Sequence, residues 1–493
     1  MKKKKNLKKL TLLHSNDLHG DFLAEKVDDK LIGGVSRLSG YINKVRNEEK
    51  NVIYSISGDM FRGSLIDSEF QGLSTIEIMN LLAPDVVTIG NHEADYGLAH
   101  MLFIEKCASF PIINANMYIK FVGTRLFDSH CIKEIDGMRV LFIGILTEEV
   151  LANTKSEGLV GTLIDIQDAA SEVAKICDAY RSEDIDLTVL LTHIGIEEDK
   201  KLAEALDPAC GVDMIIGGHS HTLLSEPCVV AGIPIVQAAV GTDQIGRFDI
   251  MVDTDSNCMD SYTWQCIPVT EENCPRDKSL EKVVKAYKDY TDEKYGRVLT
   301  RFPRAYTHPK RNMETELGDL LAECMRDQIG ADLVLLGSGS IRKPELGPVV
   351  TFRDFMEVFP FQGPVMGFRL TGRQLRHIVT FMLRDEAFED DGAERCEWFQ
   401  FSKGFFCEFD RKKHSIISLK MNGKEVEDRD VFTVAMQQYF FDSIGDFLDL
   451  PQEEIEKNGR PIEIATNAPN VLEEYFKDHE SLKLVGGKRL IIR

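Results

Sequence analysis

Five short polar motifs in the first half of the sequence contain the side chains that proteins use to hold divalent metal ions. They are Asp17-Leu18-His19, Gly58-Asp59, Gly90-Asn91-His92-Glu93, Thr192-His193 and Gly218-His219-Ser220-His221. Imidazole nitrogens suit first-row transition metals, and carboxylate or amide oxygens suit harder ions. A carboxylate can bridge two cations, and such a pair makes hydroxide available from a shared water near neutral pH. The set therefore predicts a two-metal centre of the kind that cleaves phosphate esters.

Each motif follows a short apolar run that is rich in β-branched residues. The runs cover residues 10–13, 52–56, 86–89, 187–191 and 214–216. Runs of this length favour strands over helices. In an open α/β sheet the ligand crevice lies beyond the carboxyl ends of the strands, so side chains placed there converge although the chain between them is long. We therefore expect the five motifs to share one site.

Asp59 is the natural bridging ligand of this site, because its carboxylate offers two oxygens. One ion would then be completed by Asp17, His19 and one histidine of the last motif. The other ion would take Asn91, His193 and the remaining histidine. Any one of these motifs occurs often by chance, and a lone histidine after a strand is more often a packed or surface residue. Their combination at successive strand ends favours the metal centre.

The composition indicates a globular protein with a strong negative charge. The chain has 493 residues, of which 43% are hydrophobic, enough for more than one domain with its own core. The formal net charge of -22 disfavours nucleic acid polymers and anionic membranes as partners, because they attract basic surfaces. No apolar run approaches the roughly 18 residues of a membrane span. A small phosphate ester bound through metal ions fits this charge better.

Two further features bear on the compartment. The lysine-rich start, residues 1–9, lacks the apolar core of a signal peptide, so we expect a solvated basic tail there. The 11 cysteines include no Cys-x-x-Cys pair, which favours reduced thiols over a disulfide framework. These features predict a cytoplasmic protein.

The chain divides into two α/β parts. Strand-like and helix-like segments alternate up to about residue 268, as in a layered α/β domain. Residues 271–295 are highly charged and place apolar side chains at helical spacing, and a second α/β pattern follows residue 301. We therefore expect a catalytic domain at residues 1–270, a helical linker at 271–300 and a substrate-specificity domain at 301–493.

Together the five motifs resemble the successive D-x-H, G-D, G-N-H-E/D, single His and G-H-x-H motifs of the calcineurin-like metallophosphoesterases. The resemblance implies a four-layer αββα sandwich followed by a smaller α/β C-terminal domain. It also implies two divalent ions, with manganese, zinc, iron or cobalt as open choices. By position, the first ion would be held by Asp17, His19, Asp59 and His221. The second would be held by Asp59, Asn91, His193 and His219.

The third motif also resembles the G-N-H-E-F-D string of the 5′-nucleotidases, with Ala94 in place of the aromatic residue. In that family the histidine is not a ligand but pairs with the aspartate three positions later, which implies a catalytic pair of His92 and Asp95. An imidazolium held by a carboxylate can stabilise phosphoryl oxygens or protonate a departing alkoxide, a contribution of about 100- to 10,000-fold. The alternative is that His92 only braces its loop.

Residues 301–447 resemble the 5′-nucleotidase C-terminal domain through the R-x-x-E-T start at Arg311, the turn before Arg342, the P-F pair and a late aromatic segment that ends in Gly-Asp. The resemblance implies five substrate contacts, made by Arg311, Arg342, Phe361, Phe440 and Asp446. The two arginines would bind phosphate or carboxylate, the two phenylalanines would sandwich a base, and the aspartate would bind the ribose. Three positions depart from the family pattern: Thr307, Gly337 and Gly363.

The sequence thus predicts a two-metal hydrolase of nucleoside phosphate monoesters, acting on small nucleotides through a metal-bound hydroxide with help from His92 and Asp95. One alternative keeps the same metals but changes the reaction to 2′,3′-cyclic phosphodiester, nucleotide-sugar or dinucleotide pyrophosphate hydrolysis. Another is a nucleotide-binding protein without turnover, for which a bridging carboxylate would have no purpose.

Overall fold

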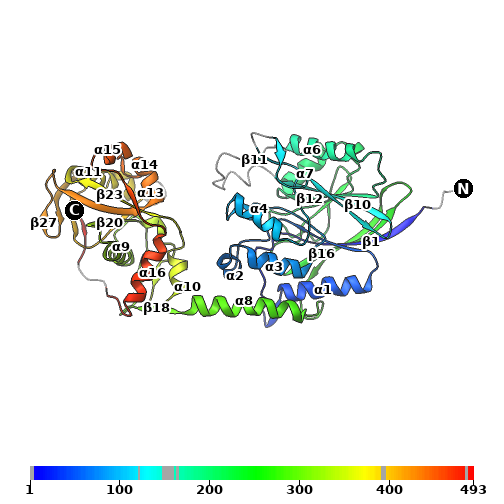
Figure 1. The fold of residues 1–493 in the computed structure, drawn as a ribbon, viewed down its shortest axis with the longest axis horizontal. Helices are drawn as coiled ribbons and strands as arrows, with labels where there is room; N and C mark the ends of the chain where they lie inside the picture. The colour runs from blue at the N-terminus through cyan, green and yellow to red at the C-terminus, as the bar shows by residue number, and fades with distance from the viewer. Residues whose placement is uncertain (1–4, 120–122, 147–159, 163–165, 390–395, 484–486) are drawn as a thin grey trace. The chain divides into compact units, whose positions relative to one another are not determined.

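The computed structural model describes residues 5–119, 123–146, 160–162, 166–389, 396–483 and 487–493, and its contacts divide the chain into two compact units. The first unit is Met1–Thr291 and the second is Asp292–Arg493 (Figure 1). The domain bounds expected from the sequence stay a prediction, and each unit is described by itself below.

The first unit contains two six-stranded sheets. One sheet has the order β17-β16-β1-β4-β5-β6, in which β1, β4, β5 and β6 run parallel, β16 is antiparallel to β1, and β17 is antiparallel to β16. Its strands are β1 (Leu7–Ser15), β4 (Val52–Ser57), β5 (Val86–Thr88), β6 (Ile112–Ile113), β16 (Gln244–Asp253) and β17 (Cys258–Pro268). The apolar runs expected to be strands lie in β1, β4 and β5 of this sheet.

The second sheet has the order β14-β15-β13-β12-β10-β9, with a parallel centre made by β10, β12, β13 and β15. Its strands are β9 (His130–Ile135), β10 (Met138–Leu146), β12 (Leu187–His193), β13 (Met214–Ile216), β14 (Cys228–Val230) and β15 (Ile233–Val236). The two remaining predicted strands are β12 and β13.

The two sheets pack face to face, and helices cover their outer faces. Buried side chains from both sheets, such as Leu12 and Phe142, form one apolar cluster between them. Another cluster joins the first sheet to α1 (Val35–Glu48), α3 (Leu73–Leu82) and α4 (Leu98–Cys107). A third joins the second sheet to α6 (Ile166–Ala179) and α7 (Ile196–Ala205). The expected four-layer αββα sandwich is therefore confirmed.

Shorter elements connect these layers. They are β2 (Glu25–Val27), β3 (Lys30–Ile32), α2 (Leu65–Glu69), η1 (His92–Ala94), β7 (Met117–Ile119), β8 (Thr124–Arg125), β11 (Val160–Thr162) and η2 (Pro208–Cys210). The expectation of a solvated tail at residues 1–9 is wrong at its end, because β1 begins at Leu7 and pairs with β16 from Asp253 onward. The side chain of Lys9 remains exposed there and bonds Glu49.

Helix α8 (Lys278–Gly296) runs through the boundary between the units. Its start is capped by Asp277, whose carboxylate accepts the backbone N–H groups of Ser279 and Leu280 and the hydroxyl of Ser39 in α1. Leu280 and Val284 are buried in the core of the first unit. The first half of α8 is thus packed on the first unit rather than being a free connector.

The second unit is a smaller α/β fold built on two sheets. The five-stranded sheet has the order β24-β20-β28-β23-β29 and the four-stranded sheet β27-β26-β25-β30. Their strands are β20 (Leu333–Gly337), β23 (Val365–Thr371), β24 (Phe399–Phe401), β25 (Phe405–Asp410), β26 (Ser415–Met421), β27 (Lys424–Glu425), β28 (Val431–Gln437), β29 (Ile462–Ala465) and β30 (Leu490–Ile492). The expected smaller α/β domain is confirmed.

Helices and short strands surround these sheets. The helices are α9 (Glu316–Ile329), η3 (Ser338–Ser340), α10 (Phe352–Val358), α11 (Gly372–Met382), η4 (Asp385–Phe388), α13 (Gln438–Asp442), α14 (Ile444–Leu448), α15 (Gln452–Glu456) and α16 (Ala468–Asp478). The short strands are β18 (Val298–Arg301), β19 (Tyr306–Thr307), β21 (Glu345–Leu346) and β22 (Val349–Thr351). Thr315 caps α9 by accepting the backbone N–H of Gly318, and Gly330 ends it in the left-handed conformation.

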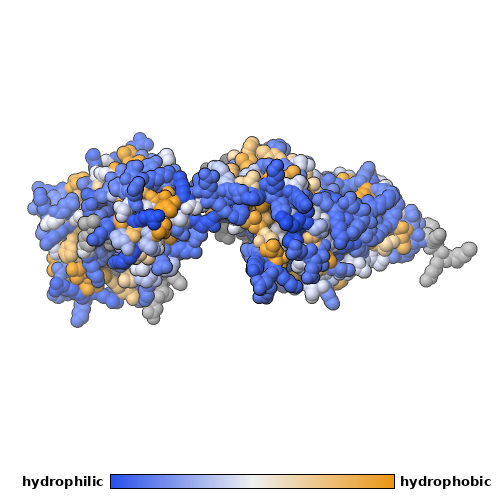
Figure 2. Space-filling model, turned by 90° about the horizontal axis from the view of Figure 1, so that it is seen from below, coloured by the Kyte–Doolittle hydropathy of each residue, from blue (hydrophilic) through white to orange (hydrophobic). Residues whose placement is uncertain are grey.

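The surface of the protein is largely hydrophilic where Figure 2 shows it. The face seen in Figure 2 is dominated by hydrophilic side chains, with apolar ones in scattered patches. Among the described residues, no helix combines the length and apolar character needed to cross a bilayer.

Candidate metal centre

The five motifs lie beyond the carboxyl ends of five strands from both sheets. Strands β1, β4 and β5 end at Ser15, Ser57 and Thr88, just before the first three motifs. Strand β12 ends on His193 itself, and β13 ends two residues before Gly218. Parallel strands of the sandwich therefore deliver all five motifs to the same edge, as the crevice rule requires.

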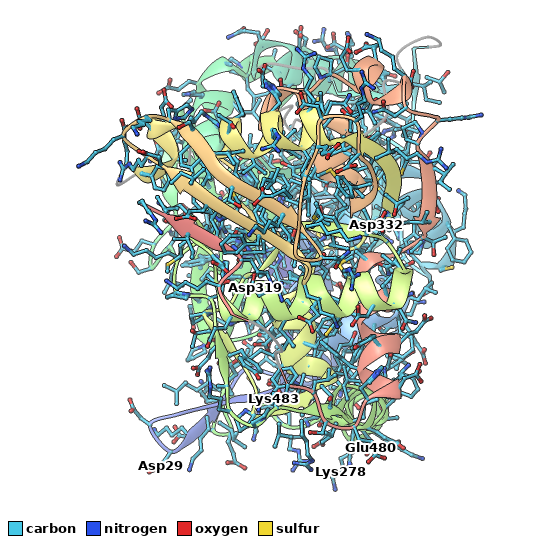
Figure 3. The ribbon with its side chains drawn as sticks, turned by 90° about the vertical axis from the view of Figure 1, so that its left-hand side faces the viewer. Asp29, Lys278, Asp319, Asp332, Glu480 and Lys483 are labelled. Atoms are coloured by element: carbon cyan, nitrogen blue, oxygen red, sulfur yellow. The ribbon has the colours of Figure 1, made fainter. Side chains whose placement is uncertain are left out.

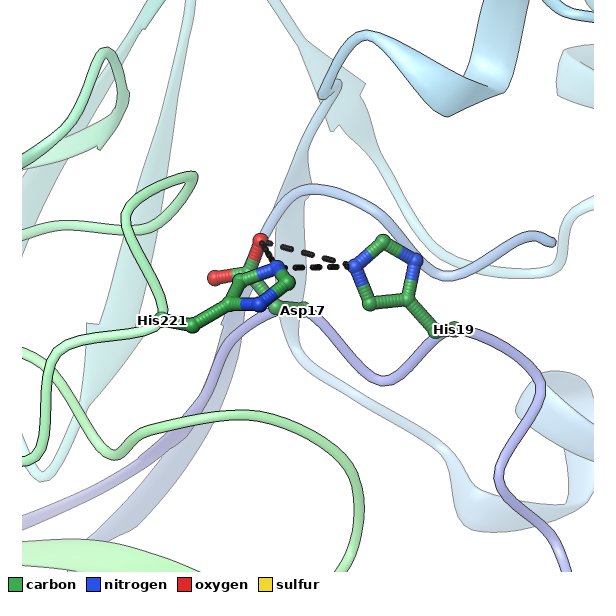
Figure 4. A group of neighbouring side chains, drawn as sticks. All are labelled: Asp17, His19 and His221. Atoms are coloured by element: carbon green, nitrogen blue, oxygen red, sulfur yellow. Dashed lines mark hydrogen bonds and ion pairs between the residues drawn. The ribbon is translucent and has the colours of Figure 1, made fainter. Parts of the chain in front are cut away.

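Asp17, His19 and His221 form one group of potential ligands (Figure 4). The Nε2 atoms of His19 and His221 are 3.0 Å apart. The Oδ1 atom of Asp17 lies 3.4 Å from His221 Nε2 and 3.9 Å from His19 Nε2. Two ring nitrogens and a carboxylate oxygen thus point at one another, which is the donor set of a transition-metal site.

Asp59, His193 and His219 form a second group, and Asn91 joins it. The Nε2 atom of His193 is 3.1 Å from Asp59 Oδ2 and 3.2 Å from Asn91 Oδ1. The same Asn91 oxygen is 3.1 Å from Nδ1 of His219. The structure therefore brings the four residues expected around the second ion to one place.

Asp59 lies between the two groups. Its Oδ2 atom, which faces His193, is also 3.8 Å from His19 Nε2. A third ligand-like group, in which all ligand atoms lie within 4.8 Å of one another, contains His19, Asp59 and His92. Asp59 is thus the carboxylate that both groups share.

The backbone at this site is strained in a consistent way. Five of the seven expected ligands have left-handed backbone, with φ of 51° at Asp17, 49° at His19, 52° at Asp59, 78° at His219 and 52° at His221. Non-glycine residues seldom adopt this region, and each such residue costs about 1–3 kcal/mol unless its surroundings fix it. Such strain clusters at functional sites. Here the strained residues are ones whose side chains point toward one another.

Backbone carbonyls orient two of the imidazole rings. Nδ1 of His19 is 3.1 Å from the carbonyl oxygen of Phe61, and Nδ1 of His193 is 2.8 Å from that of Ser57. A carbonyl can only accept, so each Nδ1 carries the proton and donates it. The Nε2 atoms of both rings therefore face the shared carboxylate, in the orientation that binds a metal ion once Nε2 carries no proton.

The glycines of the motifs make room for the ligands. A Cβ atom on Gly58 would lie 2.5 Å from Nδ1 of His193, and one on Gly218 would lie 2.8 Å from the same atom. A Cβ on Gly90 would overlap the carboxylate of Asp59. These close approaches explain why three of the motifs place glycine immediately before an expected ligand residue.

The electrostatics of the site call for added positive charge. Asp17 and Asp59 are 0% and 1% exposed. Burial raises the pKa of Asp17 above its usual value, and the neighbouring His193 only partly offsets this. At Asp59 burial also acts to raise the pKa, but His193 and the backbone N–H of His92 outweigh it and hold the pKa below its usual value. The charges of Asp17 and Asp59 repel each other, and two such buried carboxylates are stable when cations lie between them.

His92 forms the pair with Asp95 that the sequence led us to expect. Nδ1 of His92 is 2.6 Å from Oδ2 of Asp95, and the hydrogen bond raises the pKa of His92 although partial burial opposes it. The ring lies 5.2 Å from that of His19, so it borders the first group. Nη1 of Arg62 is 3.2 Å from the same Asp95 oxygen. The sequence reasoning did not include Arg62, which carries no motif signal of its own.

Glu93 is a second residue that the sequence reasoning left without a role. Its buried carboxylate accepts the backbone N–H groups of Gly90 at 2.5 Å, Met60 at 2.7 Å and Asp59 at 3.0 Å. It thereby ties the loop after β4 to the loop after β5. Its place in the motif with Asn91 and His92 was the available signal.

In the second unit, Arg342 and Phe361 lie together at the surface. The guanidinium carbon of Arg342 is 5.4 Å from the centre of the Phe361 ring, which is 46% exposed. Arg311 is half-buried, and Asp446 is exposed on α14. The four residues are therefore accessible to a ligand.

Phe440 lies differently. It is 4% exposed and packs its ring on Phe399, whereas the adjacent Tyr439 is 59% exposed. A Cβ atom on Gly337 would overlap the Phe440 ring. The glycine that departs from the family pattern thus makes the space in which Phe440 is buried, and Tyr439 is the exposed ring of this segment.

Comparison with known proteins agrees with this architecture. Residues 10–223 match the family model of the calcineurin-like phosphoesterases, and residues 294–449 match that of the 5′-nucleotidase C-terminal domain. The chain is 25% identical over 470 residues to Endonuclease YhcR of Bacillus subtilis (strain 168), covering 88% of this chain but only 37% of the relative. The chain therefore spans little more than a third of that relative's length.

Two further similarities involve 5′-nucleotidases. The chain is 26% identical over 419 residues to the 5′-nucleotidase of Mus musculus, covering 74% of this chain and 70% of the relative. The crystal structure of a 5′-nucleotidase precursor from Thermus thermophilus has the same fold, with a TM-score of 0.59, 22% identity and coverage of 98% and 99% of the two chains. The chain thus belongs to the calcineurin-like phosphoesterases with a 5′-nucleotidase C-terminal domain, a family of metal-dependent phosphoester hydrolases.

Proposed function

We propose that this protein is a two-metal hydrolase that releases phosphate from nucleoside phosphate monoesters. The observation that carries the proposal is the pair of ligand groups that share Asp59 at the carboxyl edge of the sandwich. The matching family models and the mouse relative, which is a 5′-nucleotidase, support the reaction class and the nucleotide substrate.

The residues present fit two divalent ions. The Nε2 atoms of His19 and His193 face carboxylate oxygens, and buried carboxylates supply the charge that cations need. One ion would be held by Asp17, His19, Asp59 and His221. The other would be held by Asp59, Asn91, His193 and His219. Manganese, zinc, iron and cobalt all suit this mixed donor set.

When bound, such ions lower the pKa of a water between them and neutralise charge on the phosphoryl oxygens. The protein's own residues then have separate tasks. Glu93 fixes the loops that carry Asp59 and Asn91 through its three backbone hydrogen bonds. His92, held by Asp95, stabilises the phosphoryl oxygens or gives a proton to the leaving alkoxide.

The second unit would supply nucleotide recognition. Arg311 and Arg342 would bind the anionic part of the substrate, Phe361 would stack on the base and Asp446 would bind the ribose. Because Phe440 is buried, we propose Tyr439 as the second stacking ring of this segment.

The test is phosphate release from AMP with added manganese, by the wild-type chain and by Asp59→Asn. We expect turnover in the wild type and a loss of roughly 1,000-fold or more in the variant, because metal ions contribute several kcal/mol to such reactions. Asp136→Asn, at an exposed loop, is the matched control. Equal activity of Asp59→Asn and wild type would remove the site from the reaction.

A second candidate is hydrolysis of phosphodiesters or pyrophosphates at the same metals. Arg62 favours it, because its side chain is 57% exposed and places a positive charge beside His92 that a second phosphate would meet. YhcR, an endonuclease by name, supports diester cleavage. A panel of AMP, 2′,3′-cyclic AMP, UDP-glucose and NAD distinguishes the reactions by their kcat/KM. Tight nucleotide binding with no turnover on any of them would indicate a binding protein instead.

We also propose a cytoplasmic location. All 11 cysteines are free thiols in the structure, which suits a reducing compartment. Fractionation of the source cells with an antibody to the chain tests this, and recovery outside the cytoplasm would contradict it.

A further inference from the structure

The first unit contains a pocket that none of the expected metal ligands or substrate contacts lines. It has a volume of about 430 Å³, in the range of small-molecule sites. The pocket lies between the hairpin of β2 and β3, the start of α1 and one side of α8. In Figure 3, Asp29 marks the tip of the hairpin and Lys278 the start of α8.

Arg37 gives this pocket a buried positive charge that has no hydrogen bond. The residue lies in the first turn of α1, lines the pocket and is 6% exposed. Among the described residues, no atom accepts a hydrogen bond from its guanidinium. Its one ion pair is a 3.8 Å approach to Glu271, whose own side chain is 78% exposed. A buried charge needs closer partners than this, because burial removes the water that would otherwise solvate it.

The guanidinium of Arg37 is nevertheless reachable from the pocket. Its side chain keeps 7% of its surface accessible, and its nitrogens are not among the unpaired polar atoms of the described residues that are cut off from solvent. A molecule in the pocket can therefore touch the guanidinium and supply the acceptors that the protein does not.

The start of α1 adds a second donor to the same pocket. The helix is capped by Gly34, which has no side chain to accept from the first turn. The backbone N–H of Ser36, another lining residue, has no acceptor among the described residues, whereas that of Val35 bonds the carbonyl of Phe22. Unpaired N–H groups at a helix start attract anions, and the helix dipole adds to this attraction.

The acidic residues that line the pocket are already paired. Both carboxylate oxygens of Glu281 accept from Arg276, and both oxygens of Asp289 accept from Lys285. The other two charged residues of the lining, Arg37 and Lys288, are cations. The pocket therefore has an excess of positive charge in a chain whose net charge is -22.

Much of the remaining lining is apolar. Phe22 and Val284 are each 4% exposed, and Leu23 and Leu31 are 40% and 44% exposed. A bare phosphate or carboxylate would leave this apolar surface uncovered. The combination of two anion donors with an apolar lining is what a ligand with a charged head and an apolar body requires.

We propose that this pocket binds a small amphipathic anion, namely a carboxylate or phosphate attached to an apolar group. The anionic head would bind the Arg37 guanidinium, which can make two parallel hydrogen bonds to it, and the Ser36 N–H. The apolar body would lie against Leu23 and Leu31. The net charge of the chain opposes an anionic membrane surface, so the ligand is a free molecule.

Calorimetry of the full chain with hexanoate tests the proposal. A carboxylate is the suitable probe because a phosphate ester would also meet the proposed metal centre. Hexanoate should bind saturably. Acetate, which lacks the apolar body, and hexanamide, which lacks the charge, should each bind at least tenfold more weakly. Hexanamide that binds as tightly as hexanoate would overturn the proposal, as would binding of phosphatidylglycerol vesicles without binding of hexanoate.

Variants of the two charged groups locate the carboxylate. Arg37→Met should lower hexanoate affinity roughly 10- to 150-fold, as for the loss of a hydrogen bond to a charged group. Arg46→Met, in the same helix but paired with Asp85, is the matched control and should leave the affinity unchanged. Glu271→Gln should raise the affinity, because it removes the one acidic neighbour of Arg37. Unchanged affinity in a folded Arg37→Met would overturn the proposal.

A pair of exposed hairpin residues gives a test that does not depend on a buried side chain. Leu31→Glu places a negative charge in the pocket lining and should lower hexanoate affinity at least tenfold. Val27→Glu, in the same hairpin at 48% exposure but outside the lining, should change it little. Equal losses in the two variants would overturn the proposal.

This proposal stands apart from the proposed function. Asp59→Asn should bind hexanoate as the wild type does, whatever its effect on phosphate release. A chain that hydrolyses AMP but binds no hexanoate would keep the hydrolase and refute the pocket, and the opposite result would keep the pocket alone.

Discussion

The expected metal ligands and the expected nucleotide contacts are held in opposite ways. In the first unit, five of seven ligands have left-handed backbone, and Asp17, Asp59 and His193 are buried. In the second unit, Arg342 and Asp446 are exposed, and Phe361 is 46% exposed. The metal ligands must meet within a few ångströms, so their backbone is fixed, whereas base contacts need only an accessible face. Recognition residues can therefore change place along the chain more easily than metal ligands.

The largest effect expected from this difference is that of Asp59→Asn. Because the shared ligand serves every substrate, activity toward AMP and p-nitrophenyl phosphate should fall by the same factor, roughly 1,000-fold or more. Initial rates on both substrates measure this. A loss of activity confined to AMP would contradict this, because it would give Asp59 a role in nucleotide recognition and not in the step common to both substrates.

His92→Gln should lower kcat by about 100- to 10,000-fold, since we propose that the ring acts on the reacting phosphate. Metal content by elemental analysis should remain that of the wild type. His100→Gln, in α4, is the control, because its ring bonds the carbonyl of Gln71, contacts Tyr96 and Phe103, and belongs to none of the ligand-like groups. Loss of metal in His92→Gln would make His92 a ligand instead.

Glu93→Gln should weaken metal binding by roughly 10- to 100-fold, as expected for a residue that orients ligands. The amide cannot accept three backbone N–H groups as a carboxylate does. Manganese titration of activity measures the change, with exposed Glu48→Gln as the control. Unchanged affinity would show that the two loops hold their ligands without this link.

Tyr439→Ala should raise KM for AMP by roughly 5- to 150-fold, since a stacked base is worth about 1–3 kcal/mol. KM for p-nitrophenyl phosphate, which has no base, should stay the same. Phe440→Ala should mainly destabilise the second unit, by about 3–5 kcal/mol, because it removes a buried ring. If Phe440→Ala instead raised KM for AMP and Tyr439→Ala did not, Phe440 would be the stacking residue.

These contrasts also explain what the sequence could predict. The strands and the meeting of their motifs follow from apolar runs and the crevice rule, whereas the four-layer fold and the assignment of ligands to two ions came from the family resemblance. The burial of Phe440 could not be predicted, because it depends on the space beside Gly337, which lies far away along the chain. Nor could the contacts of Arg62 and Glu93, which depend on how two loops pack.

The anchoring of α8 limits where the chain can be divided. Leu280 and Val284, both after the expected boundary at residue 270, are 1% and 4% exposed within the apolar layer under the first sheet. A truncated protein that stops at 270 would lose them and leave a gap of the kind that lowers stability by about 2–5 kcal/mol per large side chain. Isolation of the phosphoesterase half therefore calls for a terminus at or beyond Thr291.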